Sequence, residues 1–204
     1  MNLHAVEASL RQVQRERAAL NLEDRVLENM VAGYAFVDAL AAEDSDIFAM
    51  GNLRHLLELN TLVLCGTSAL RRGAYRRHID ATAQRFYEER DGGIRDVVEC
   101  ATGLVRQPVW HRAAGVYVRM LSKPQLFIEG NHRTGTLVMS YLLLRAGAPP
   151  FVLSPQNADA YFGPSAVVRE THKHGPAMWF RGAAARRRLA ALLRAEAHRH
   201  ELLT

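Results

Sequence analysis

Apolar residues recur at helical spacing along almost the whole chain, and this periodicity constrains the fold more than any other feature. Between Glu23 and Leu40 they fall three or four residues apart, the pattern of an amphipathic α-helix. The same spacing predicts helices at Leu3–Leu20, Ile47–Cys65, Ile94–Val105 and Trp110–Leu121. Strand-like segments are too few for a sheet-based nucleotide-binding fold. The sequence therefore predicts an all-α protein without a Rossmann unit or a P-loop.

The last third of the chain divides into shorter pieces. Phe151–Leu153 reads as a short extended segment after the Pro-Pro stop at 149–150. Two short helices are expected at Asn157–Phe162 and Ser165–Lys173, separated by Gly-Pro at 163–164. Gly182–Leu203 reads as an amphipathic helix with leucines inward, and its arginines are most simply a solvated face.

A turn rich in glycine and polar residues precedes the apolar run at 137–144, and it predicts a phosphate site. Gly130 and Gly135 bracket backbone N–H groups that can converge on an anion, where the following helix adds the positive end of its dipole. Arg133 would supply a guanidinium fork, and Glu129 a carboxylate able to hold a divalent cation beside the phosphates. The expected phosphate-binding residues are Gly130, Asn131, His132, Arg133, Thr134 and Gly135.

These residues resemble the signature of the Fic family, His-Pro-Phe-x-Asp/Glu-Gly-Asn-Gly-Arg-x-x-Arg. The matching residues are Phe127, Glu129, Gly130, Asn131 and Arg133. Most Fic proteins transfer a nucleoside monophosphate, usually AMP, onto a hydroxyl of a target protein. The resemblance covers roughly residues 47–173 and implies a Fic-like helical domain. It also implies ATP or another nucleotide with Mg²⁺ as cofactors, a protein target or partner, and a packing role for Phe127.

Four positions depart from the family pattern, and two of them bear on catalysis. Gln125 stands where the family has its general base, and a carboxamide has no useful basicity near neutral pH. Thr136 replaces the last arginine, so a contact to the terminal phosphate is missing. His132 replaces a glycine and is either a displaced base or a residue that reshapes and crowds the turn. Leu126 replaces the family's proline.

Three hypotheses follow. The first is a non-canonical or catalytically silent Fic module that binds a nucleotide or another phosphorylated ligand and acts through a partner. The second is a transferase with an altered mechanism, in which Gln125 and His132 are the catalytic candidates. The third is a structural interaction protein whose turn merely caps a helix through Asn131 and Thr134. The first ranks slightly above the second, because phosphate contacts can persist without the base whereas the reaction cannot easily do so.

The predicted domain plan has three segments: an N-terminal helical arm at 1–45, a Fic-like core at 46–175, and a C-terminal basic helix at 176–204 packed on the core. Fic proteins carry a short β-hairpin flap before their motif, and the turn-rich Gly66–Tyr75 is a candidate for its reduced form. Gly73–Glu89 stays ambiguous between a helix and part of that flap. Tyr117 and His111, on the helix before the motif, are candidates to approach the site.

Composition limits the remaining options. The 204 residues, 49% of them hydrophobic, suffice for one independently stable domain. Cys65 and Cys100 lack metal-type spacing, and the N-terminal region has neither a signal peptide nor a membrane span, so we expect a cytoplasmic protein without a membrane role. The net charge of +5 suggests nucleic acid, but much of it sits in two arginine groups with simpler interpretations, so we do not expect that partner. The arginines at 186–194 are a solvated helix face, and those at 71–77 are an alternative basic rim for an acidic ligand or partner. Apolar residues on the first helix, including Val6 and Leu20, suggest homo-oligomerisation or packing back onto the domain.

Overall fold

The computed structural model describes residues 1–17 and 22–204, and within these residues helices are the only regular secondary structure. This confirms the predicted all-α class. The α-helices are α1 (Leu3–Glu16), α2 (Asp24–Ala42), α3 (Arg54–Cys65), α4 (Ala69–Ala74), α5 (Arg76–Glu88), α6 (Ile94–Gly103), α7 (Val109–Leu121), α8 (Asn131–Arg145), α9 (Ala158–Arg169) and α10 (Ala183–Ala195). A short 3₁₀ turn, Met50–Asn52, precedes α3 and two more follow α10, at Glu196–His198 and His200–Leu202. A π-helical turn, Met178–Gly182, precedes α10.

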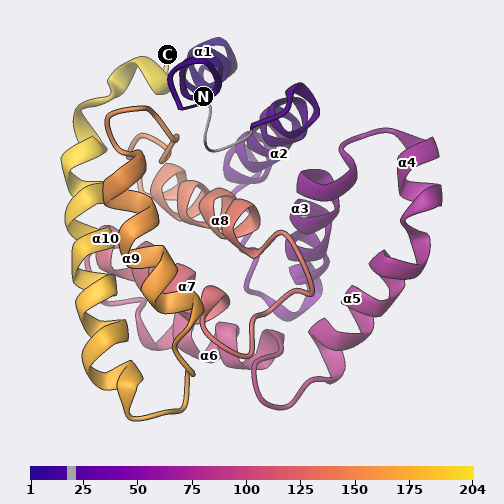
Figure 1. Ribbon diagram of the computed structural model, residues 1–204, viewed down its shortest axis with the longest axis vertical. Helices are drawn as coiled ribbons and strands as arrows, with labels where there is room; N and C mark the ends of the chain where they lie inside the picture. The colour runs from indigo at the N-terminus through magenta and orange to yellow at the C-terminus, as the bar shows by residue number, and fades with distance from the viewer. Residues whose placement is uncertain (18–21) are drawn as a thin grey trace.

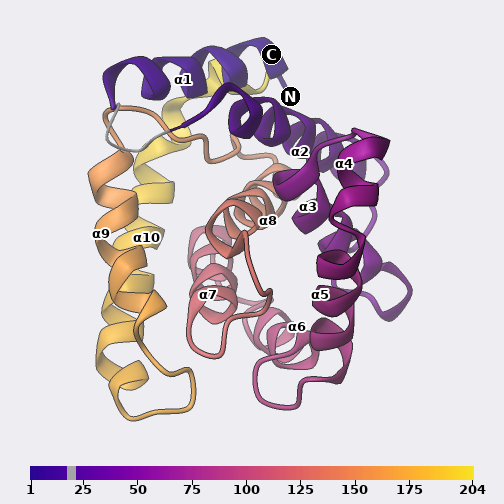
Figure 2. The ribbon, with the colours of Figure 1, turned by 45° about the vertical axis from the view of Figure 1, so that its right-hand side comes forward.

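Helix α8 lies in the middle of the molecule and is buried on almost every side (Figure 1). It packs against α7, α2 and α3, while α10 packs against α7 and α9. Turning the molecule shows α9 and α10 as a pair along one side and α3 to α5 along the other, with α7 and α8 between them (Figure 2). A helix apolar all round, as α8 is through Leu137, Val138, Leu142 and Leu143, is stable only inside such a shell.

The N-terminal helix packs back onto the domain. Val6, Leu10 and Val13 are buried, so these residues are not available for self-association. The backbone N–H of Asn2 donates to the carbonyl of Leu202 at 2.9 Å, which brings the two ends of the chain together (Figure 1). Leu20, predicted to share this face, lies outside the described residues. The three-segment plan stays a prediction, and all three segments contribute to one core.

The predicted β-hairpin flap is wrong. Gly66–Tyr75 instead contains helix α4, which begins after Ser68, whose hydroxyl accepts a hydrogen bond from the N–H of Arg71 at 3.4 Å. A serine at this position caps a helix, so the turn signal marked a helix start rather than a hairpin. The ambiguous Gly73–Glu89 segment holds the end of α4 and the whole of α5, and it is therefore mainly helical.

One further prediction for the last third is corrected. Helix α9 runs unbroken through Pro164, where two short helices were expected. Proline inside a helix costs about 3 kcal/mol, but Tyr161, Pro164 and Val168 are all buried, and this packing outweighs the cost. Phe151–Leu153 has no strand partner among the described residues. The carbonyl of Phe151 instead accepts hydrogen bonds from the hydroxyls of Tyr34 and Ser140.

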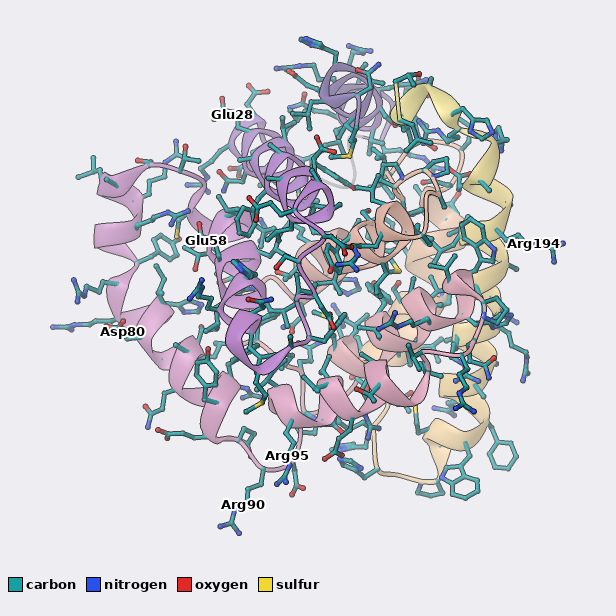
Figure 3. All side chains as sticks on the ribbon, turned by 180° about the vertical axis from the view of Figure 1, so that it is seen from behind. Glu28, Glu58, Asp80, Arg90, Arg95 and Arg194 are labelled. Atoms are coloured by element: carbon teal, nitrogen blue, oxygen red, sulfur yellow. The ribbon has the colours of Figure 1, made fainter. Side chains whose placement is uncertain are left out.

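The basic helix is only partly the solvated face that was predicted. Arg187, Arg188 and Arg194 are exposed, and Figure 3 shows Arg194 extending from α10 away from the body of the molecule. Arg186, however, turns inward and lines a cavity against α6 and α7. None of the described helices combines the length and the apolar character needed to cross a bilayer.

Candidate functional site

The predicted phosphate motif forms the loop between α7 and α8. Gly130 immediately precedes α8 in the left-handed region, with φ of 78°, and a Cβ there would lie 2.9 Å from the Nδ2 atom of Asn60. A glycine is therefore required on both conformational and steric grounds. No side chain caps α8, so within the described chain the N–H groups of its first turn have no side-chain acceptor. This is the backbone arrangement that suits an anion.

Two asparagines hold the loop in shape. Asn131 accepts from the N–H of Phe127 at 2.9 Å and donates to the carbonyl of the same residue at 2.8 Å. Asn60, on α3, donates to the carbonyl of Glu129 at 2.9 Å and to the hydroxyl of Thr134 at 3.1 Å. Both asparagines are buried, so these bonds are shielded from water. The loop is thus fixed before any ligand arrives.

The side chain of Gln125 makes hydrogen bonds within the protein through both of its polar atoms. Its Nε2 donates to the carbonyl of Leu121 at 3.1 Å, and its Oε1 accepts from Asn131 at 3.2 Å. Arg85, from α5, donates to the backbone carbonyl of Gln125 at 2.9 Å. Gln125 therefore ties the end of α7 to the start of α8, where the family pattern has a base.

Arg133 and Glu129 lie at the rim of the turn. Arg133 donates through Nη1 to the carbonyl of Val63 at 2.7 Å, and its Nη2 lies 4.0 Å from Oε1 of Glu129. The pKa of the Arg133 guanidinium is lowered, because the effect of burial exceeds the opposing effect of the neighbouring Glu129 carboxylate. The side chain of Glu129 is 58% exposed, so its carboxylate is accessible to a cation. One carboxylate plus ligand phosphates is a common way to hold Mg²⁺, and the residues present fit that role.

His132 joins a buried hydroxyl cluster. Its Nδ1 lies 3.0 Å from the hydroxyl of Tyr117, which is 2.9 Å from that of Tyr161 and 2.8 Å from that of Ser165. Burial, and secondarily the charge of Arg169, lower the pKa of His132 to about 4. The imidazole is therefore neutral at pH 7.

The proton positions in this cluster follow from counting donors. Ser165 donates to the Tyr161 carbonyl at 2.6 Å and Thr136 to the His132 carbonyl at 3.0 Å, because a carbonyl can only accept. Tyr161 then donates to Thr136 at 2.8 Å. Tyr117 donates to the hydroxyl of Tyr161 at 2.9 Å, so its proton is not available to His132. His132 completes the cluster by donating from Nδ1 to Tyr117, and its Nε2 keeps a free lone pair.

No protein-family model, curated protein or solved structure matches this chain.

The structure brings the predicted residues together only in part. Gly130, Asn131, His132 and Arg133 form the first turn of α8, but Phe127 and Thr134 face inward and are buried. Phe127 stacks on Phe86 of α5 with centroids 5.8 Å apart, which agrees with its predicted packing role. Gly135 is close to the ring of Tyr117, 2.7 Å from where its Cβ would lie, so it serves packing rather than an anion.

Of the two further candidates on α7, Tyr117 reaches the site and His111 does not. His111 lines a separate cavity with residues of α10. Sequence reasoning missed Asn60, Arg85 and Tyr161. Asn60 had one usable signal, since it is a polar residue in the middle of the apolar run of α3, and such a residue requires a buried partner.

Proposed function

We propose that the protein is a Fic-like module that binds a nucleotide or another phosphorylated ligand at the N-terminus of α8 and lacks the family's usual transfer chemistry. The observation that carries this proposal is the left-handed Gly130, which leaves the first-turn N–H groups of α8 without a side-chain cap. Helix N-termini of this kind stabilise phosphate through N–H donors and the helix dipole together. In this proposal the module acts through a protein partner.

Charged residues at the turn support the same reading. Arg133 is held by Val63 with its second nitrogen near Glu129, so its orientation is set without a ligand. A preoriented guanidinium loses less entropy on binding phosphate than a free one. A bound Mg²⁺ would neutralise phosphate charge, and Glu129 is the residue that would hold it.

The assignment as a silent module rests on Gln125. Both polar atoms of its side chain are already hydrogen-bonded within the protein, and a carboxamide cannot take a proton from a hydroxyl near pH 7. The residue therefore supports the loop and offers no base to a target.

A second candidate function is nucleotide transfer with His132 as a displaced base. The hydrogen bond between His132 and Tyr117 favours it, because the donor count leaves the lone pair of Nε2 free. The Nε2 atom also keeps contact with solvent. A pKa of about 4 makes this imidazole a weak base, however. Transfer through His132 therefore ranks second.

Calorimetric titration tests the proposal. Purified protein is titrated with ATP, ADP, AMP, GTP and inorganic pyrophosphate, with and without Mg²⁺. The same series is run on Arg133→Ala and on Arg90→Ala, a control arginine that projects into solvent between α5 and α6 (Figure 3). We expect saturable binding that weakens at least tenfold in Arg133→Ala and stays within twofold of wild type in Arg90→Ala.

Two results would decide against parts of this proposal. Absence of binding to every phosphate compound would leave a scaffold whose turn is structural. Binding accompanied by a nucleotide adduct on a protein target, detected by mass spectrometry and abolished in His132→Ala, would replace the silent module by the transferase.

A further inference from the structure

A second candidate site lies away from the motif, in a cavity of about 540 Å³ between α6, α7 and the π-helical turn before α10. We refer to it as the Arg186 cavity. No residue of the 125–135 loop lines it. Much of its wall is apolar, formed by Leu104, Val118, Met178, Trp179 and Ala183. Its volume falls within the range of small-molecule pockets, about 300–1,000 Å³.

Two glycines allow side chains of the cavity wall to pack directly on the backbone. A Cβ on Gly115 would lie 2.4 Å from Leu104 and 3.4 Å from the stem of Arg186, and a Cβ on Gly182 would lie against the sulfur of Met178. The side chains of the wall therefore approach the backbone of α7 and of the π-helical turn closely.

Polar atoms without partners converge on this cavity. The Nε atoms of Arg186 and Arg119 are buried and make no hydrogen bond within the described chain. Arg186 also makes no ion pair with any described residue, unlike Arg119, which lies 2.5 Å from Asp96. Buried donors without acceptors are costly. Arg186 in particular lacks an anion.

The charge balance of the wall points the same way. Asp96 is shared by Arg119 and by Lys173, whose Nζ lies 3.1 Å from its Oδ2. Arg186 lines the same cavity as Arg119 and Asp96, so the wall and the buried ion group carry three basic side chains and one buried carboxylate. The other acid of the wall, Glu99, is 71% exposed and pairs with Arg95 at 3.5 Å. One further negative charge would balance the group. A doubly charged phosphate would be repelled by Asp96 and Glu99.

We propose that the Arg186 cavity binds a small amphipathic carboxylate, with the carboxylate on Arg186 and an apolar body against Leu104, Met178 and Trp179. Trp179 is 81% exposed, and a large aromatic side chain exposed at the rim of a cavity is suited to cover an apolar ligand. Arginine pairs with carboxylates through two parallel hydrogen bonds, which would use the donors that lack partners.

Titration with decanoate and with the neutral 1-decanol tests this proposal. Arg186→Met removes the charge and keeps an apolar stem, and Arg188→Met is the matched control, an exposed arginine on the same helix. We expect saturable decanoate binding that weakens at least tenfold in Arg186→Met and less than twofold in Arg188→Met. Decanol binding should not depend on Arg186. Ligand binding should change the tryptophan fluorescence of Trp110→Phe but not of Trp179→Phe.

A second variant keeps the test independent of the folding of Arg186→Met. Ala183→Phe places a ring in the cavity from the first turn of α10 and should abolish binding of both ligands. Circular dichroism checks that each variant is helical. The proposal is overturned if wild-type protein shows no saturable decanoate binding below the concentration at which decanoate self-associates. It is equally overturned if decanoate binds Arg186→Met or Ala183→Phe as tightly as wild type.

Discussion

The loop at 125–135 and the Arg186 cavity treat polar groups in opposite ways. In the loop, Asn60, Gln125 and Asn131 pair almost entirely with one another and with the backbone. In the cavity, Arg186 and Arg119 each keep a buried Nε without a hydrogen-bond partner among the described residues. In the region marked by a sequence motif the side chains are thus paired internally and the uncapped backbone N–H groups of α8 are left for a ligand, whereas in the region without a motif side-chain donors are left unpaired. A motif predicts a backbone shape more directly than it predicts an active group.

The largest expected effect concerns the ion group beside the cavity. Asp96→Ala leaves Arg119 and Lys173 without their shared carboxylate, and Lys173 is fully buried. Removing one partner of a buried ion pair costs about 3–5 kcal/mol, so we expect a loss of that size in the free energy of unfolding, measured by urea denaturation. Glu99→Ala, one helical turn away and exposed, is the control and should change stability by less than about 0.5 kcal/mol. Equal effects of the two variants would contradict the account of the group.

The next effect concerns the completeness of the loop. Asn131→Ala removes both bonds to Phe127 and the bond to Gln125, and leaves buried backbone groups unpaired. We expect about 2–4 kcal/mol of destabilisation in thermal or urea unfolding. Glu129→Ala, an exposed change in the same loop, should stay within about 0.5 kcal/mol of wild type. A small effect of Asn131→Ala would show that the loop is held mainly by packing.

The next prediction tests the close packing of Tyr117 against the motif helix by replacing a helical glycine with alanine at two positions. At Gly135 a Cβ would lie 2.7 Å from the ring of Tyr117, whereas at Gly163 it would meet no heavy atom within 4 Å. Gly135→Ala should therefore destabilise by about 1–3 kcal/mol, and Gly163→Ala should stabilise by up to about 1 kcal/mol through helix propensity. The two differ in sign, which calorimetric melting temperatures would detect.

The smallest expected effect is the acid dependence from His132. Its pKa, lowered to about 4, lies below the unfolded value of 6.5, so the unfolded state binds the proton more readily. Its contribution to stability is full above pH 6.5 and is lost as the pH falls toward 4. In His132→Gln the loss of unfolding free energy between pH 7 and 5.5 should be smaller by about 1 kcal/mol than in wild type. His174→Gln, an exposed histidine variant, is the control. An unchanged slope in His132→Gln would contradict the burial argument.

Local signals predicted much of this fold, and long-range contacts account for most of what they missed. The periodicity of α7 and α8 was sufficient to place the motif between them, and the chemistry of Gln125 excluded a base from sequence alone. The unbroken course of α9 through Pro164 depends on burial that sequence spacing does not report. The inward position of Arg186 is likewise a long-range feature, since its stem lies beside Gly115, 71 residues earlier in the chain. The sequence alone does not show which arginine of a helix lies inward and which is exposed, because that depends on the neighbouring helices.

The attachment of the loop to α3 and α5 limits what can be done with it outside this protein. Asn60 holds Glu129 and Thr134, Arg85 holds the carbonyl of Gln125, and Phe86 stacks on Phe127, all from helices that precede the loop by dozens of residues. A synthetic peptide of residues 125–135, or the same segment grafted between two helices of another scaffold, would lack every one of these anchors. The conformation of this turn therefore depends on the whole helical assembly, and we expect the isolated segment not to keep it.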